Sequence, residues 1–247
     1  MIDYFGEAVA ATYDRNSVER FAPELVESIV AVLAELAGDG RALELGVGTG
    51  RIALPLAARG VPVHGIELSA AMVARLRAKP GGAGIGVTLG DFASTNVGAD
   101  FTLAYLVFNT IMNLTTQDAQ VACFRAVAEQ LAPGGCFLVE VMVPELRKLP
   151  AGQTAVPFGF GPERWAYSDY DPATQSVICH YLDTGRGTHR SVPFRYVWPA
   201  ELDLMARLAG LELRHRWADW ERRPFTGESA QHVSVWAKPD SGDGPRR

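Results

Sequence analysis

Short apolar runs and longer segments with a helical period alternate through the first 142 residues. The segments with a helical period are 17–37, the one ending at residue 59, the one that follows Ser69, and 116–131. The apolar runs are 41–45, 61–67, 85–89, 101–107 and 136–142. Because strands that alternate with helices form a parallel sheet covered on both faces, this pattern predicts a doubly wound α/β core.

The pattern changes after residue 142, where prolines and glycines become frequent. The runs 177–182 and 191–197 flank a Thr-Gly-Arg-Gly turn and predict an antiparallel pair. A helix over 199–209 begins with proline, and 211–217 and 232–237 follow as closing strands. We therefore expect a mostly parallel seven-stranded sheet with a small antiparallel β insertion. The expected regions are a core over 1–142, the insertion over 143–198, the rest of the core over 199–239 and a disordered tail over 240–247.

Composition disfavours several classes of protein. The net charge is −5 and no Lys/Arg block occurs, which disfavours a nucleic-acid partner. The three cysteines are widely spaced and form no CxxC, so neither a disulfide framework nor a structural zinc site is indicated. Residues 1–11 do not resemble a signal peptide, and the apolar run 101–108 is too short to span a bilayer. We expect a cytoplasmic protein without a membrane partner; a homodimer stays open.

A glycine loop follows the first predicted strand. It reads Glu-Leu-Gly-Val-Gly-Thr-Gly-Arg from Glu44 to Arg51, with glycines at 46, 48 and 50. Such a loop lets the backbone turn sharply and approach a ligand, and the helix start that follows favours an anionic group. The dinucleotide fingerprint needs glycine at the sixth position, where this chain has Arg51, so NAD is disfavoured. A tight turn without a ligand is the alternative.

Acidic residues follow the next two predicted strands. Glu67 ends the second strand, which places its carboxylate at the crevice where ligands of doubly wound sheets bind, and where it can accept hydrogen bonds from ribose hydroxyls. Asp91 and Phe92 follow the third strand and offer an acceptor and an apolar face to an adenine. A solvated charge at a strand end is the alternative for Glu67.

These motifs, together with Leu-Ala-Pro-Gly-Gly at 131–135, resemble the ordered motif set of class I S-adenosylmethionine-dependent methyltransferases, whose core is Rossmann-like. The resemblance implies S-adenosyl-L-methionine as cofactor, with Glu44 bracing the loop and the methionine amino group. Residues 11–14 are also similar to the start of small natural-product and sugar N-methyltransferases, in which a tyrosine reaches the cofactor carboxylate. A packed aromatic is the alternative for that tyrosine. The implied cofactor-binding residues are Tyr13, Glu44, Gly46, Gly48, Gly50, Glu67, Leu68, Asp91, Phe92 and Leu106.

Methyl transfer from a sulfonium depends mainly on alignment, so no catalytic triad is needed. We take Glu140, at the end of the fifth strand, as the first acid/base candidate and His180, in the insertion, as the second. Asn109 follows the fourth strand and is a candidate to orient the acceptor. Surface charge and helix capping are the alternatives for Glu140 and Asn109. Segment 101–113 holds no carboxylate, so we expect no metal.

The expected function is methyl transfer from S-adenosylmethionine to oxygen or nitrogen, and less readily to carbon, of a small molecule. Three alternatives stay open: an enzyme that uses the cofactor without methylating, such as a cyclase; a binding module without catalysis; and an oxidoreductase, which the glycine spacing disfavours.

Overall fold

The structure, a computed structural model, describes residues 4–16 and 18–240 and contains two β-sheets. Sheet A has seven strands in the order β10-β11-β5-β4-β1-β2-β3. Its strands are β1 (Arg41–Leu45), β2 (Val63–Glu67), β3 (Gly86–Leu89), β4 (Phe101–Leu106), β5 (Leu131–Met142), β10 (Glu212–Trp217) and β11 (Gln231–Ala237). The pairs among β1 to β5 are parallel, whereas β11 runs antiparallel to both of its neighbours. The predicted fold class is confirmed.

The direction in which the chain builds sheet A reverses beside β1. From β1 the chain adds β2 and β3 on one side, then crosses to add β4 and β5 on the other. Ligands of doubly wound sheets bind at such a switch point, outside the carboxyl ends of the strands. The loops after Leu45, Glu67 and Leu106 all leave the sheet at this edge, which we call the carboxyl edge.

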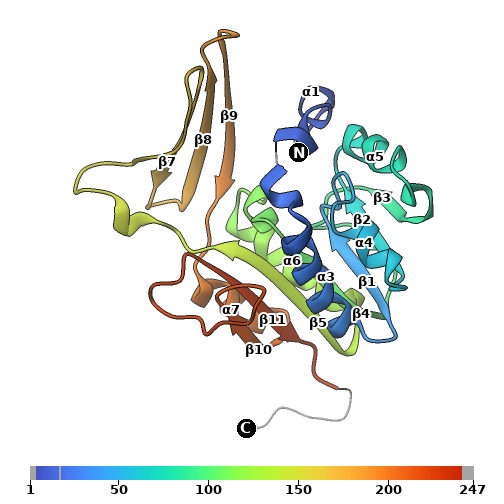
Figure 1. The fold of residues 1–247 in the computed structure, drawn as a ribbon. Coiled ribbons are helices and arrows are strands. Elements are labelled where there is room, and N and C mark those ends of the chain that lie inside the picture. Colours follow the sequence, from blue (N-terminus) through green and yellow to red (C-terminus); the bar gives the residue numbers. More distant parts are fainter. Residues whose placement is uncertain (1–3, 17, 241–247) are drawn as a thin grey trace.

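Helices cover both faces of sheet A (Figure 1). The longer helices are α3 (Pro23–Ala37), α4 (Ala53–Ala58), α5 (Ala70–Arg77), α6 (Gln117–Gln130) and α7 (Pro199–Leu208). Short helical segments are α1 (Glu7–Ala10), α2 (Tyr13–Asn16), η1 (Val18–Phe21), η2 (Gly82–Gly84), η3 (Thr110–Asn113) and η4 (Leu146–Lys148). Side chains cap two of the longer helices, since the Ser69 and Thr116 hydroxyls accept hydrogen bonds from backbone N–H groups of the first turn. None of the described helices is long and apolar enough to cross a membrane.

The helix expected over 17–37 begins later than predicted. Its first residue is Pro23, whose missing N–H is tolerated at a helix start, and residues 18–21 form the separate 3₁₀ turn η1. The residue before a proline avoids the helical region, and Ala22 has ψ 125°. The beginning of the expected helix, Ser17, lies outside the described residues, as do 241–247 of the expected tail.

Two apolar layers hold sheet A between its helices. Along β4, Leu103 and Tyr105 face the layer that contains Ile29 of α3, while Ala104 and Leu106 face the layer that contains Phe124 of α6. All four β4 side chains are fully buried, as expected for a central strand of a parallel sheet.

Sheet B stands beyond the carboxyl end of β5 (Figure 1). It has four antiparallel strands: β6 (Ala155–Phe160), β7 (Arg164–Asp171), β8 (Ser176–Asp183) and β9 (Thr188–Arg195). The sequence predicts the last pair, although the second of the two runs was placed three residues late. The first pair was missed: a proline and a glycine interrupt β6, and without β6 the run of β7 had no predicted partner before it.

Candidate functional site

The glycine loop is held against the end of β2. The N–H groups of Gly46 and Val47 both donate to the carbonyl of Ile66, at 2.8 and 3.1 Å. Gly46 and Gly50 have φ of 73° and 80°, a region that favours glycine. A Cβ at Gly46 would lie 2.8 Å from Thr110 Cγ2, so the loop closes tightly against the segment after β4.

Glu67 ties this loop to the following helix. Its Oε2 accepts a hydrogen bond from Gly48 N–H at 2.8 Å, and its Oε1 accepts one from Ser69 N–H at 2.9 Å. The side chain is largely buried, at 8% exposure. Each carboxylate oxygen can accept more than one hydrogen bond, so this arrangement still suits hydroxyl donors of a ligand.

Glu44 lies beneath the loop as a buried carboxyl group. It accepts a hydrogen bond from the Tyr105 hydroxyl at 2.9 Å, and that tyrosine is fully buried on β4. Burial raises the pKa of Glu44 to about 8, although the Tyr105 hydrogen bond and the charge of Arg51 act in the opposite direction. The role of Glu44 in bracing the loop and the methionine amino group stays a prediction.

Arg51 places a cation at the centre of the carboxyl edge. Its guanidinium lies 3.2 Å from the ring centroid of Phe108 and donates to the carbonyl of Arg20 at 3.1 Å. Burial lowers its pKa to about 10, while Tyr13, Glu44 and Glu140 favour its charged form. Sequence reasoning used this residue only to exclude NAD. Its place directly after the third loop glycine, at a helix start, was the available indication of a site residue.

The N-terminal segment covers the glycine loop. Asp14 accepts a hydrogen bond from the Thr49 hydroxyl at 2.6 Å and pairs with Lys79 at 2.6 Å. The Ser69 hydroxyl donates to the carbonyl of Phe5 at 3.0 Å. Tyr13 begins α2 in this segment and interacts electrostatically with Arg51. Tyr13 thus belongs to the segment that packs on the loop through Asp14, and its role toward the cofactor stays a prediction.

The remaining residues expected to bind cofactor lie around the same edge. Asp91 accepts a hydrogen bond from Ala93 N–H at 2.9 Å, while Phe92 is buried near Gly46. Leu68 is half-buried after β2, and Leu106 is fully buried at the end of β4. Nine of the ten expected cofactor residues thus lie at or beside the carboxyl edge, and the tenth, Tyr13, belongs to the N-terminal segment that packs on the glycine loop. Their role in cofactor binding stays a prediction.

Glu140 and Asn109 meet at the end of β5. Glu140 accepts hydrogen bonds from Phe108 N–H and from the Trp220 indole N–H, both at 2.9 Å. Burial raises its pKa, against the effect of these hydrogen bonds and of Arg51 and Arg20. Asn109 has φ 62°, and its side-chain oxygen accepts from Met142 N–H at 2.7 Å. Both side chains hold the ends of β4 and β5 together, and Asn109 is not part of a helix.

His180 lies apart from these residues. It pairs across β8 and β9 with Ser191, and its ring lies 4.6 Å from the ring of Tyr167. Side chains of a strand alternate between faces, so His180 faces away from its neighbour Tyr181. Tyr181 shares its face with Val177, which packs on the core, whereas His180 is on the outer face of sheet B. The structure does not bring His180 to the carboxyl edge.

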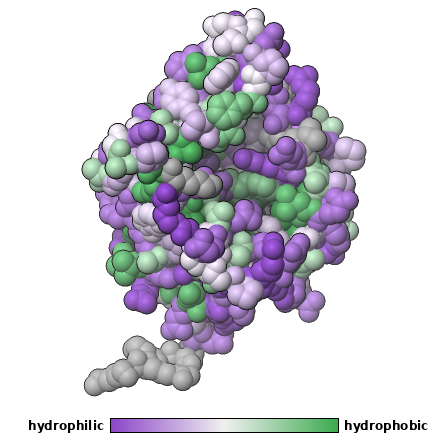
Figure 2. All heavy atoms as spheres, turned by 60° about the vertical axis from the view of Figure 1, so that its left-hand side comes forward, coloured by the Kyte–Doolittle hydropathy of each residue, from purple (hydrophilic) through white to green (hydrophobic). Residues whose placement is uncertain are grey.

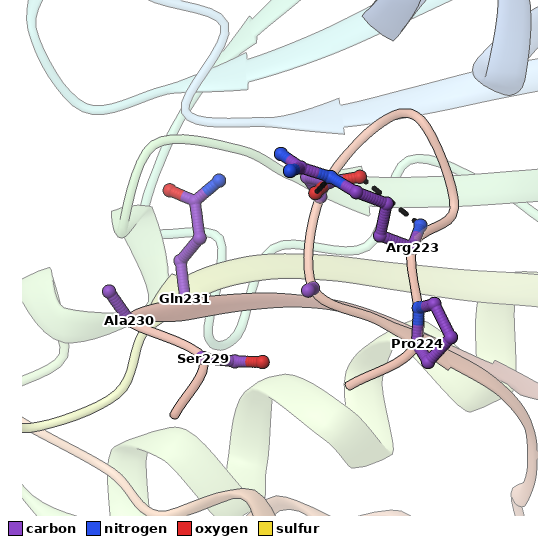
Figure 3. A pocket seen from close by; sticks show the side chains of 7 residues that line it. Arg223, Pro224, Ser229, Ala230 and Gln231 are labelled. Atoms are coloured by element: carbon purple, nitrogen blue, oxygen red, sulfur yellow. Dashed lines mark hydrogen bonds and ion pairs between the residues drawn. The ribbon is translucent and has the colours of Figure 1, made fainter. Parts of the chain in front are cut away.

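A hollow lies in the loop between β10 and β11 (Figure 3). Its volume is about 350 Å³, and its lining includes Arg223, Ser229 and Gln231. Arg223 bonds to the Asp219 carboxylate, and Gln231 is paired with Met142 at the end of β5. The hollow is therefore beside the end of β5. Another, of about 470 Å³, includes Gly40 and His64 in its lining and is at the opposite edge of sheet A.

Among the described residues, no group of three or more His, Cys, Asp or Glu side chains is arranged to hold a metal ion. The expectation that no metal is needed stays a prediction.

Comparison with known proteins identifies the class. A family model described as a methyltransferase domain matches residues 42–135. The CcbJ methyltransferase from Streptomyces caelestis is 39% identical, with a TM-score of 0.82, over 96% of this chain and 98% of that one. A cypemycin N-terminal methyltransferase from a Streptomyces species is 27% identical over 91% of this chain and 97% of its own length. CalS10, an amino pentose methyltransferase from Micromonospora echinaspora with S-adenosylmethionine bound, is 20% identical, with a TM-score of 0.68, over 96% of this chain and 99% of that one.

The motif order found in the sequence, the switch point beside β1 and the match over nearly the whole chain agree with one another. The chain belongs to the S-adenosylmethionine-dependent methyltransferases.

Proposed function

We propose that this enzyme transfers the methyl group of S-adenosylmethionine to a nitrogen atom of a small molecule. The observation that carries the proposal is that no carboxylate at the carboxyl edge is free to act as a general base. Glu44, Glu67 and Glu140 are all buried, and each already accepts hydrogen bonds from the protein. A hydroxyl acceptor needs a base to take its proton, whereas an amine that has lost its proton in water does not.

The residues present fit the cofactor. Gly48 has φ 54°, and a Cβ at this position would meet only the Gly46 carbonyl oxygen, at 3.9 Å, so the loop leaves space for a ligand there. Glu67 offers acceptors for ribose hydroxyls, and Arg51 offers a half-buried guanidinium for a carboxylate. When bound, the cofactor supplies an activated methyl group with a neutral thioether as leaving group. The protein aligns the acceptor and excludes water, which can contribute roughly 7–11 kcal/mol to the barrier reduction.

The cations at this edge favour a neutral acceptor nitrogen. Arg51 is half-buried, and the charges of Arg51 and Arg20 both lower the pKa of Glu140 against the effect of burial. A protonated amine is repelled by both guanidinium groups, so the neutral form binds preferentially. The neutral form is also the nucleophile.

The relatives support nitrogen as the acceptor atom. One curated relative is an N-terminal methyltransferase, and structural neighbours include a sugar N-methyltransferase and a glycopeptide N-methyltransferase. Peptide and sugar amines are therefore both reasonable acceptor classes to test. We assign cofactor binding to regions 1–142 and 199–239 and acceptor binding to region 143–198.

The cellular setting belongs to the same proposal. Cys123 and Cys136 are buried thiols, and Cys179 is also unpaired, which suits a reducing cytoplasm. We expect no nucleic-acid partner, and the oligomeric state is to be measured directly.

The test uses purified enzyme with cofactor carrying a labelled methyl group. Acceptors are offered as matched pairs that differ only in an amino or a hydroxyl group, and products are read by mass spectrometry. We expect label on the amines alone, with a rate that rises with pH as the amine loses its proton. Methylated hydroxyls would overturn the choice of nitrogen. Cofactor binding without transfer to any acceptor would favour a binding module, and conversion of the cofactor itself would favour a non-methylating enzyme.

A further inference from the structure

Two histidines lie next to each other on the outer face of sheet B. His180 of β8 is paired with Ser191 of β9, and His189 lies two positions before Ser191 on the same strand. Side chains two positions apart on a strand share a face, so all three point to the outer face. His189 and Ser191 are exposed and His180 is half-buried. The strands β8 and β9 project beyond the core, so an ion in solvent reaches this face directly (Figure 1).

The polar atoms of these three side chains form a small triangle. The His180 Nδ1 atom lies 3.2 Å from His189 Nε2 and 2.9 Å from Ser191 Oγ. The third side, from Ser191 Oγ to His189 Nε2, is 3.2 Å. The ring of Tyr167 lies 4.6 Å from the ring of His180, nearly parallel to it, and limits its orientation. Two ligands bound at about 2.0–2.1 Å to a tetrahedral zinc ion lie roughly 3.3–3.4 Å apart. The three atoms therefore have nearly the spacing of one face of such a tetrahedron, and a tilt of the two imidazoles would direct both nitrogens at one ion.

The surroundings of the triangle do not repel a cation. The regular pairing of β7, β8 and β9 places these other side chains on the same face: Trp165, Tyr167, Asp169, Ile178, Leu182 and Pro193. One of them is a carboxylate, and none is a lysine or an arginine. Arg190 alternates to the inner face, where its guanidinium lies 4.6 Å from the ring centroid of Tyr181. The two imidazoles are thus the nitrogen ligands available on this part of sheet B.

We propose that His180 and His189 bind a divalent transition metal ion on the outer face of sheet B, with the Ser191 hydroxyl as a weak third ligand. Neutral imidazole binds zinc and copper(II) through either ring nitrogen, and copper(II) binds more tightly than zinc. Catalytic zinc is held by three protein ligands, so a site with two histidines exchanges its ion with the solvent. The bound ion would connect β8 to β9. This site goes beyond the proposed function, and the expectation that methyl transfer needs no metal is unaffected by it.

The experiment uses the full chain without an affinity tag and without cofactor. Copper(II) and zinc are titrated separately by calorimetry, and we expect one ion to bind each chain, copper(II) more tightly. His180→Gln and His189→Gln keep a polar side chain of similar size, and each should weaken copper(II) binding about tenfold or more. The double variant should abolish binding, and Ser191→Ala should weaken it less. Electron paramagnetic resonance of the copper(II) form should show two imidazole nitrogens in the wild type and one in each single histidine variant.

The matched control is His215→Gln. His215 is an exposed histidine of β10 and lies 5.0 Å from the ring of Trp217, as His180 lies beside Tyr167. This variant should bind copper(II) as the wild type does. Zinc should also raise the melting temperature of the wild type and leave that of the double variant unchanged, because only the folded site binds the ion. No binding to the wild type, binding that survives in the double variant, an equal loss in the control, or a single imidazole nitrogen in the wild-type spectrum would overturn the proposal.

Discussion

The two sheets differ in how many of their faces are packed. The central strands of sheet A are buried on both faces, so their positions are fixed by packing on either side. Sheet B packs through one face only, and Phe160 and Trp165 are 68% and 51% exposed. Figure 2 shows hydrophobic residues among hydrophilic ones over the upper part of the molecule, where sheet B lies. The comparison indicates that the sheet proposed to bind the cofactor is fixed by packing on both faces, whereas the sheet proposed to bind the acceptor is fixed through one face only.

A buried polar network joins the two sheets. Arg195, at the end of β9, pairs with Glu201 of α7 at 2.7 Å and donates to Gln120 of α6. The side chains of Arg195 and Glu201 are only 5% and 14% exposed. Sheet B is thus fixed at its base to the helices that cover sheet A, and its outer end projects beyond the core.

The largest expected effect comes from breaking this connection. Arg195→Met leaves Glu201 buried without its cation, which costs about 3–5 kcal/mol of unfolding free energy. In a domain of this size the melting temperature should fall by roughly 10 °C. Arg186→Met, which removes an exposed arginine of the β8–β9 hairpin, should change the unfolding free energy by less than about 0.5 kcal/mol. Calorimetry of both variants decides, and equal stability would show that the network does not hold sheet B.

The second-largest expected effect concerns Glu67, at the carboxyl edge of sheet A, and the affinity for the cofactor. Glu67→Ala removes the acceptor expected for two ribose hydroxyls, and we expect S-adenosylhomocysteine to bind about 100-fold more weakly. Glu67→Gln keeps the size and one acceptor oxygen, so its loss should be intermediate. Titration calorimetry measures both affinities, with thermal unfolding as the folding control. A loss of less than about threefold for the alanine variant would mean that Glu67 does not hold the ribose.

The sequence predicted sheet A and the loops at its carboxyl edge better than it predicted sheet B. The glycine loop and Glu67 lie within short strand–loop–helix units, where local chemistry determines the backbone, and the structure brings them together. Arg51 is different, because its burial depends on Phe108 and Arg20, which belong to other segments. Likewise, Glu140 meets Trp220 across 80 positions of sequence. The pattern of residues along one sequence does not show which side chains from distant segments will contact each other.

Strand β6 shows a second limit of prediction. Its proline and glycine mark it as a loop, yet it is an edge strand, where a missing N–H or side chain is tolerated. The same reasoning placed His180 near the acceptor because it recognised the insertion but not which face of β8 would pack on the core.

The third effect is a pH dependence of folding stability that arises from Glu44 of sheet A. The pKa of Glu44 is about 8 in the folded protein, above the ordinary value of 4.5 for a glutamate. Between these values the folded state keeps a proton that the unfolded state has released, so stability falls as pH rises from about 4.5 through 8. Glu44→Gln stays neutral and should flatten this part of the curve for the cofactor-free protein. Melting temperatures at pH 5, 6, 7 and 8 test this. An unchanged slope would show that Glu44 is ionised beside Arg51.

The smallest expected effect separates the two faces of sheet B. His180 and Tyr167 stack on the outer face, whereas Tyr181 lies on the inner face with Arg190. His180→Ala removes exposed contacts only, so cofactor affinity, unfolding temperature and the rate with any amine acceptor should each stay within about twofold or a few degrees of wild type. Tyr181→Phe is the matched change on the inner face and should raise the acceptor KM with cofactor affinity unchanged. If His180→Ala alters turnover while the protein remains folded and binds cofactor, the outer face takes part in acceptor binding. The acceptor would then contact both faces at the edge of sheet B, and the division between a packed inner face and a free outer face would be wrong.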